Sequence, residues 1–242
     1  MIKSHKIAQS MQWFETTLGS YLLEREYRYF DKVVANIFGY NAIQISLPQF
    51  NFLRLNRMPL QFSISSEANH SSLMAEPAFL PIQSNSIDLV IMPHTLDFSA
   101  NPHQILREVY RVLIPEGHVV MSGFNPFSLW GLARYLKVNR NTFPWNGNFI
   151  ALLRLKDWLK LLDFETMGGE LCCYAPPFEQ EKWRQRFRFM EAAGDRWWPI
   201  GGGVYFLHAI KHMHGMRVIK PGWKKNIDSR ARIVSVTQKL NK

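Results

Sequence analysis

The stretch Leu80–Pro126 constrains the fold most, because it reads as a complete strand–helix–strand unit. Its first part, Ile87–Met92, is a short apolar run between turn residues, which is typical of a strand buried on both faces of a parallel sheet. Asn101 and Pro102 suit the cap and first position of a helix whose apolar residues then recur along one face. A Pro-Glu-Gly sequence is expected to end that helix before a second buried strand at residues 119–122. The unit has the length of a right-handed parallel crossover, which predicts an α/β fold.

Ligands in such folds collect beyond the carboxyl ends of the strands. In this chain those ends are Pro93-His94 and Phe124-Asn125. His94 could orient a substrate or remove a proton, and Asp97 is close enough in sequence to polarise it. A loop histidine that packs beside the ligand region is the alternative reading.

The same stretch resembles the second half of a class I S-adenosylmethionine-dependent methyltransferase domain, of the bacterial kind called type 11. The resemblance is carried without a gap by LPIQSNSIDLVI, REVYRVLIPEG and VVMSGFN. It implies an α/β, doubly wound, mostly parallel seven-stranded sheet with an antiparallel last strand. It also implies that S-adenosyl-L-methionine is the cofactor and that its methyl group is transferred to an acceptor, which the sequence does not identify.

The expected first strand, residues 42–47, leads into a turn without glycine. The resemblance places Gln44 where the family has an acidic residue and Ser46 where it has the first glycine of its cofactor-binding turn. Both side chains could hydrogen-bond the amino-acid part of the cofactor. Pro48 removes one N–H donor from the turn. The pocket is therefore expected to be either remodelled or lost.

Further candidates for cofactor contact are two carboxylates and one aromatic side chain. Glu67 comes after the expected second strand and could accept both ribose hydroxyls, although a solvated carboxylate is the plainer reading. Glu76 stands where the family's carboxylate faces the adenine amine, and Phe79 could flank the ring. The predicted cofactor contacts are thus Gln44, Ser46, Glu67, Glu76, Phe79, Pro93 and His94, and His94 is also the predicted catalytic residue.

Residues 11–38 form an apolar helical face, with Glu24, Arg25 and Glu26 expected on the solvated side. Gly19 is a candidate break and Gly39 a candidate end. The segment either covers the cofactor or serves only in packing. Further along, helices are expected at residues 127–136, 154–162 and 181–193, an irregular helix at 50–58, a poor strand within 71–80, and strands at 60–65, 164–167, 171–174 and 204–210.

The net charge of +10 is concentrated at one end. From Lys211 onward the chain carries nine Lys and Arg residues and one acidic residue. We expect an N-terminal helical segment at residues 1–40, a methyltransferase-like domain at 41–215 and a basic tail at 216–242. The tail is either solvated or contacts phosphates. The alternative function is a catalytically inactive module that binds RNA or a protein through the tail and through Arg184, Arg186 and Arg188.

Several classes are disfavoured. No apolar run has the ~20 residues of a membrane span and no signal-peptide core is present, so a cytoplasmic protein without membrane contact is expected. Cys172 and Cys173 are adjacent and read as buried hydrophobic residues. The histidines at 208, 212 and 214 are spaced too widely along a strand for one zinc ion, so no metal site is expected. GxSxG, CxxC and HExxH motifs do not occur.

Overall fold

The computed structural model describes residues 10–67, 70–136, 142–179 and 200–212, together with 182, 186, 187, 189–191 and 194. The expected basic tail at 216–242 lies outside the described residues, as do Arg184, Arg188 and most of the helix expected at 181–193. The domain boundaries at 40 and 215 remain predictions.

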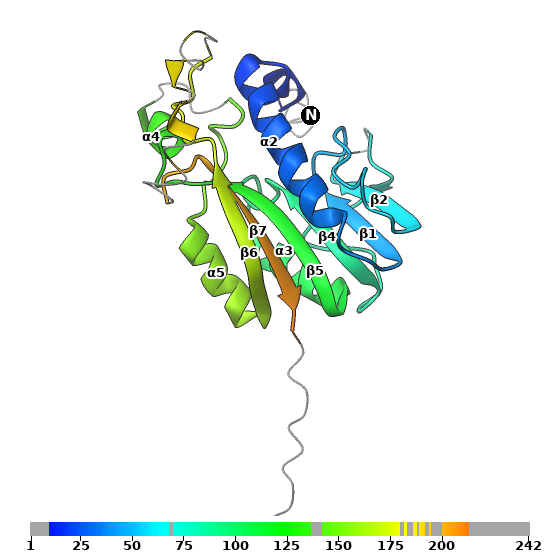
Figure 1. Cartoon of the computed structure of the whole chain (residues 1–242). Helices are drawn as coiled ribbons and strands as arrows, with labels where there is room; N and C mark the ends of the chain where they lie inside the picture. Colours follow the sequence, from blue (N-terminus) through cyan, green and yellow to red (C-terminus); the bar gives the residue numbers. More distant parts are fainter. Residues whose placement is uncertain are drawn as a thin grey trace, which may run out of the picture.

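Seven strands form one sheet in the order β3-β2-β1-β4-β5-β7-β6 (Figure 1). The first five pair in parallel, and β7 runs antiparallel to both of its neighbours. This arrangement confirms the doubly wound, mostly parallel sheet that the sequence predicts. The strands are β1 (Asn41–Ile45), β2 (Leu60–Ser65), β3 (Leu73–Met74), β4 (Ile87–Pro93), β5 (Leu113–Phe124), β6 (Phe164–Cys172) and β7 (Val204–Lys211).

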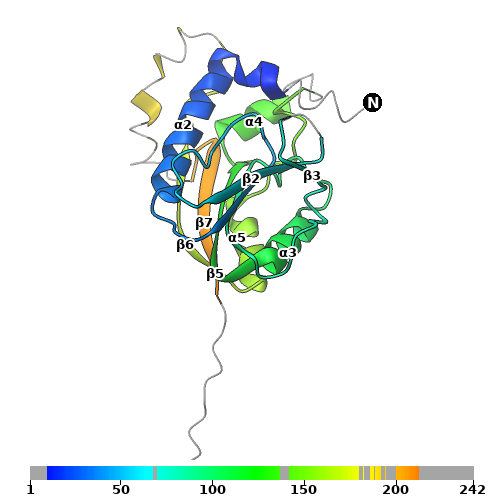
Figure 2. The same ribbon diagram turned by 90° about the vertical axis from the view of Figure 1, so that its right-hand side faces the viewer.

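Helices cover both faces of the sheet (Figure 2). One face packs against α3 (Pro102–Val112) and α5 (Leu152–Leu161), the other against α2 (Thr17–Val34), and α4 (Leu129–Leu136) lies near the end of α2. A hydrophobic core lies on each face of the sheet, and successive residues of the central strands point alternately into the two. Val90 faces α3, whereas Leu89 and Ile91 face α2. Burial on both faces is the reason that β4 reads as a continuous apolar run.

The N-terminal helical region breaks at Thr16 and not at Gly19. The hydroxyl of Thr16 accepts a hydrogen bond from the Gly19 N–H, which makes Thr16 the N-cap of α2. At the other end α2 stops at Val34, so Gly39 does not end it. Glu26, which the sequence placed on the solvated side, is fully buried on the apolar face of α2.

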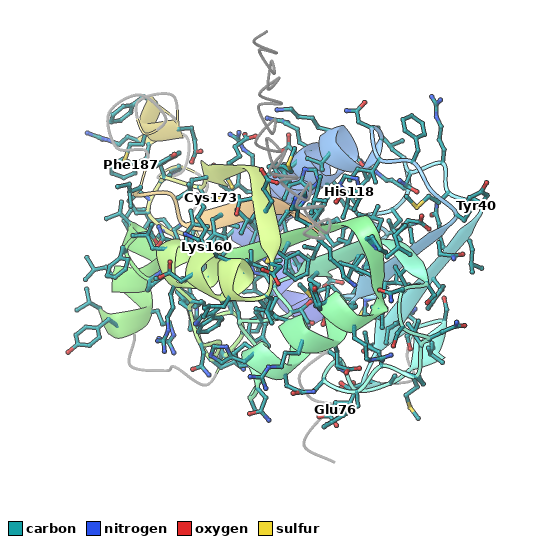
Figure 3. All side chains as sticks on the ribbon, turned by 90° about the horizontal axis from the view of Figure 1, so that it is seen from below. Tyr40, Glu76, His118, Lys160, Cys173 and Phe187 are labelled. Carbon is teal, nitrogen blue, oxygen red and sulfur yellow. The ribbon has the colours of Figure 1, made fainter. Side chains whose placement is uncertain are left out.

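Gly39 is needed instead for the close approach of a neighbouring strand. A Cβ there would lie 2.5 Å from the Cβ of Asp88. The Asp88 carboxylate accepts hydrogen bonds from the backbone N–H groups of Tyr40 and Asn41 and so fixes the start of β1. Tyr40 itself projects from the edge of the molecule, as Figure 3 shows.

Strand β5 begins at Leu113, directly after α3, and so includes the Pro-Glu-Gly sequence that was expected to separate them. Glu116 takes a left-handed φ of 61°, and the pairing of β4 with β5 shifts between Ile87 and Leu89, which accommodates the irregular backbone. Lys211 stabilises this junction, because its buried ammonium donates to the carbonyl oxygens of Tyr110 and Leu113.

Three other elements differ from expectation. Residues 50–58 form turns in place of an irregular helix. The poor strand within residues 71–80 is reduced to the two residues of β3. The strands expected at 164–167 and 171–174 are one strand, β6, because a bulge between Thr166 and Gly168 carries the pairing through the glycines.

The cysteines and histidines are accounted for within the fold. Cys172 and Cys173 are free and buried. His208 on β7 lies 2.9 Å from His118 on β5, nitrogen to nitrogen, and burial together with the neighbouring His118 lowers the pKa of His208 to about 4. His214 lies outside the described residues. Within the described ranges, no cluster of three or more His, Cys, Asp or Glu is arranged to hold a metal ion, and no helix has the length and apolar character to span a membrane.

Candidate ligand site at the strand ends

A cavity of about 370 Å³ lies at the carboxyl ends of β1, β2 and β4. This is the volume range of small-molecule pockets, ~300–1,000 Å³, and the place where parallel sheets bind ligands. Ser10, from the segment before α2, and Phe143 and Asn146, from the loop after α4, complete the wall. Within the described residues, the N-terminal segment therefore reaches the cavity through Ser10 in addition to packing on the sheet.

The turn after β1 adopts a glycine-like backbone without glycine. Ser46 has a φ of 74° and Leu47 a φ of 46°, both in the left-handed region. Such a conformation costs a residue with a Cβ roughly 1–2 kcal/mol. Both residues line the cavity, and the Leu47 side chain also packs against the hydrophobic core beneath α2. The turn is thus remodelled in sequence while the cavity beside it stays open.

Gln44 holds this turn in place. Its side-chain N–H₂ group donates to the carbonyl oxygens of Leu47 at 3.0 Å and Phe50 at 2.7 Å, with that of Ser46 at 3.3 Å. Its amide oxygen accepts from the Phe52 N–H at 3.0 Å. An amide supplies both donors and an acceptor, which a carboxylate cannot do. This explains why glutamine can stand where the resemblance implies an acid.

The structure brings together five of the seven predicted cofactor contacts: Ser46, Glu67, Glu76, Pro93 and His94 all line the cavity. Glu76 comes from the β3 end of the sheet and is labelled in Figure 3. Two do not line it. Gln44 is turned into the loop that it supports, and Phe79 is 68% exposed on the surface.

The described wall of the cavity carries carboxylates and neutral polar groups. Glu67 and Glu76 are its acidic residues, and none of the described lining residues is Lys or Arg. The side-chain amide of Gln49 and the Oδ1 atom of Asn146 are buried there with no hydrogen-bond partner among the described residues. Phosphate groups are normally bound by cationic side chains or free N–H groups, and the described part of this wall offers no Lys or Arg for that purpose.

A buried ionic cluster lies beside the cavity floor. His94 Nδ1 lies 3.1 Å from Asp97 Oδ2, and His94 Nε2 lies 3.0 Å from Glu26 Oε1. The hydroxyl of Ser122 donates to Glu26, and the N–H of Phe124 donates to Asp97. The cluster therefore joins α2 to the ends of β4 and β5. Because the two carboxylates sit on opposite ring nitrogens, they do not converge on one metal ion.

This environment keeps His94 protonated. Burial alone would lower its pKa, but Glu26 and Asp97 together raise the pKa of His94 to about 9. Burial raises the pKa of Asp97, and the contact with His94 opposes that rise. Both ring nitrogens of His94 face carboxylates and its side chain is 1% exposed. The ring is therefore not placed to accept a proton from a molecule in the cavity.

The stability of the protein should fall as the pH rises through 9. The folded-state pKa of His94, about 9, lies above its unfolded value near 6.5, so the stabilisation is complete below pH 6.5 and is lost as the pH passes 9. Urea unfolding at pH 6 and pH 10 should differ by about 3 kcal/mol for a shift of this size. The part of this slope that is due to His94 should be absent in His94→Leu, and a wild-type profile that is flat between these pH values would contradict the assignment.

Sequence reasoning missed Glu26, Gln49 and Asn146. For Glu26 a signal existed: it stands four residues after Leu22 and four before Phe30, on the helix stripe that is otherwise apolar. An acid on such a stripe needs a buried partner. Gln49 lies in the turn after the first strand, whose position the sequence did indicate, whereas Asn146 lies in a loop to which no pattern pointed.

Comparison with known proteins agrees with this geometry. Residues 40–121 match a family model described as a methyltransferase domain. The uncharacterised protein YafS of Escherichia coli K12 is 41% identical over 107 residues, which are 44% of this chain and 45% of that protein. The match thus spans less than half of that relative.

Solved structures share the fold. A possible histamine N-methyltransferase from Thermotoga maritima superposes with a TM-score of 0.61 at 15% identity, covering 86% of this chain and 97% of that one. A methyltransferase from Archaeoglobus fulgidus gives 0.57 at 15% identity, covering 78% and 93%. The chain therefore has the fold of these methyltransferases. The family match covers residues 40–121, which are less than half of the chain, so this part of the chain is similar to a methyltransferase domain.

Proposed function

We propose that this protein binds S-adenosylmethionine in the strand-end cavity and transfers its methyl group to an acceptor. The observation that carries the proposal is the open cavity beside a left-handed turn at Ser46 and Leu47, in a chain whose residues 40–121 match the methyltransferase domain. When bound, the cofactor supplies an already activated methyl donor. The protein then has mainly to position two reactants and exclude water.

The lining residues fit that cofactor. We propose that Glu67, after the second strand, accepts hydrogen bonds from the ribose hydroxyls. We also propose that Glu76 faces the adenine amine, as the family resemblance implies. Ser46 and Gln49, on the turn after β1, are the groups for the amino-acid part. The positively charged cofactor also suits a wall on which the described charged groups, apart from the buried imidazolium of His94, are carboxylates.

For His94 we propose a positioning role in place of proton transfer. Its ring is clamped between Glu26 and Asp97, and it stacks on Phe124 with ring centroids 4.1 Å apart. In this arrangement the ring holds the ends of β4 and β5 to α2. The loop after α4 is tied to the same place, because Asn148 donates its N–H to the Asp97 carbonyl at 2.6 Å.

Calorimetric titration tests the proposal directly. S-adenosylmethionine should bind with micromolar affinity, whereas NADH, which carries phosphates, should not bind. Glu67→Ala should weaken binding by roughly 10-fold or more, because hydrogen bonds to a charged group contribute about 1.5–3 kcal/mol. Glu165→Gln on the exposed start of β6 is the matched control and should bind as wild type does.

Absence of binding at millimolar cofactor would overturn the enzyme and favour the inactive binding module. That alternative draws support from the glycine-free turn and from the strain at Ser46 and Leu47. Removing residues 217–242 tests its RNA arm: salt-sensitive RNA binding should be sharply weakened if the tail contacts phosphates. Unchanged RNA binding would show that the tail does not contribute to it.

A further inference from the structure

The ionic cluster of Glu26, His94 and Asp97 carries a net charge of −1. An imidazolium between two carboxylates sums to −1. Moving one proton from the ring to either carboxylate leaves a neutral imidazole, one acid and one carboxylate, which again sums to −1. The charge of the cluster therefore does not depend on where that proton resides.

Little in the protein compensates this charge. In the described part of the chain, His94 is the only cationic side chain that pairs with Glu26 or Asp97. Three neutral donors assist: the Ser122 hydroxyl, which donates to Glu26, and the backbone N–H groups of Phe124 and Ile150 beside Asp97. The second oxygen of Glu26, Oε2, is buried with no hydrogen-bond partner among the described residues. An uncompensated charge in a dry interior is unfavourable, and a nearby cation relieves it.

The cavity is the place from which such a cation can act. Pro93, His94 and Thr95 line the cavity, so the cluster lies directly beside its floor. Glu67 is half-buried and Glu76 is exposed, so water and salt screen their charges. The cluster is fully buried and is screened much less.

We propose that the uncompensated charge of the Glu26–His94–Asp97 cluster makes the cavity select a cationic ligand and bind S-adenosylmethionine in preference to its neutral product. This inference rests on the proposed function. The sulfonium of S-adenosylmethionine is positive, whereas the thioether of S-adenosylhomocysteine is neutral. The same charge thus favours entry of the donor and release of the product, and Glu26 acts as a specificity-determining residue that does not touch the ligand.

The test compares three ligands on one variant. Glu26→Gln removes one negative charge while keeping an oxygen that can accept from Ser122. Wild-type protein and variant are titrated calorimetrically at pH 6.0, below the ordinary pKa of histidine, with S-adenosylmethionine, S-adenosylhomocysteine and sinefungin, whose ammonium replaces the sulfonium. We expect the variant to lose on the order of tenfold in affinity for both cations, the scale of a charge pair ~10 Å apart at an effective dielectric constant of ~20. Affinity for the neutral product should change less than about twofold on the same argument.

The control is Glu165→Gln, the same chemical change at the opposite end of the sheet. Glu165 pairs level with Ile210 and His118, about 20 Å along β5 from Phe124 at ~3.3 Å per residue. It should leave all three affinities unchanged. Equal losses for all three ligands in Glu26→Gln would overturn the charge selection and leave Glu26 as a packing residue. If the wild-type protein binds none of the three, the proposed function itself fails.

A second variant keeps the test informative if Glu26→Gln does not fold. Asp97→Asn removes the other carboxylate charge, and its amide oxygen can still accept from the Phe124 N–H. The thermal unfolding midpoint without ligand is measured for each variant first. A folded Asp97→Asn protein that keeps the wild-type ratio of donor to product affinity would overturn the inference.

Discussion

Replacing His94 by leucine is expected to lower the free energy of unfolding by about 3–5 kcal/mol, the cost of breaking a buried ion pair by removing one partner. The change leaves the carboxylates of Glu26 and Asp97 buried without their cation. Each must then be protonated or rehydrated, and either process opposes packing of α2 on the sheet. Urea unfolding monitored by tryptophan fluorescence measures the loss, because Trp130 and Trp145 are buried in the folded protein.

The matched control is His212→Ala. His212 also pairs with an acid, at 3.3 Å from Glu116, but both side chains are exposed, by 48% and 63%. An exposed pair contributes about 0–1 kcal/mol, so its removal should be nearly neutral. The double variant Glu26→Leu/His94→Leu should recover part of the loss, because one stranded carboxylate is gone. A loss below about 1 kcal/mol in His94→Leu would contradict the buried-cluster interpretation.

Replacing Gln44 by glutamate is expected to be nearly as damaging, although glutamate is the residue type that the family resemblance implies at this position. A carboxylate could still accept from the Phe52 N–H, but it would present negative oxygens to the carbonyls of Leu47 and Phe50. The two carbonyls lose their donor and the turn loses its anchor. We expect a loss of about 2–4 kcal/mol in stability, from one unsatisfied buried group or more.

The affinity of Gln44→Glu for S-adenosylmethionine should also fall, by roughly tenfold or more, because the turn would be displaced from its strained conformation. The control is Gln61→Glu. The Gln61 amide also donates to two carbonyls, those of Asn56 and Met58, but its side chain is exposed and water can replace it. Measurement combines urea unfolding with S-adenosylmethionine calorimetry. If Gln44→Glu were as stable as the wild-type protein, the turn would keep its conformation without the amide of Gln44.

The organisation of the sheet could be predicted because its signals are local. The apolar run of β4, the face of α3 and the proline at its first position are each read from neighbouring residues. The antiparallel last strand followed from family resemblance, not from any local pattern. Where the expectation failed, as at Thr16 or in the bulged β6, the outcome depended on hydrogen bonds or strand pairing that the sequence pattern does not specify.

The candidate site was predictable only where it follows strand ends. Glu67, Pro93 and His94 were found because each follows a recognisable strand or lies at its end. Ser46 and Glu76 were found through the family resemblance, and all five line one cavity. Gln44 was placed on the correct strand but was predicted to contact the cofactor, whereas its side chain bonds to the turn after β1. The sequence shows the position of this residue but not its hydrogen-bond partners.

The sequence by itself determined most of the segments that form the sheet and the strand ends that meet at the cavity, because periodicity and turn residues are properties of short segments. Tertiary structure alone decided that Glu26, 68 residues before His94 in the chain, would meet it at 3.0 Å. It also decided that an amide would hold open a turn that has no glycine. Both depend on long-range packing of α2 and of the loop after β1, which brings together groups that no local pattern relates.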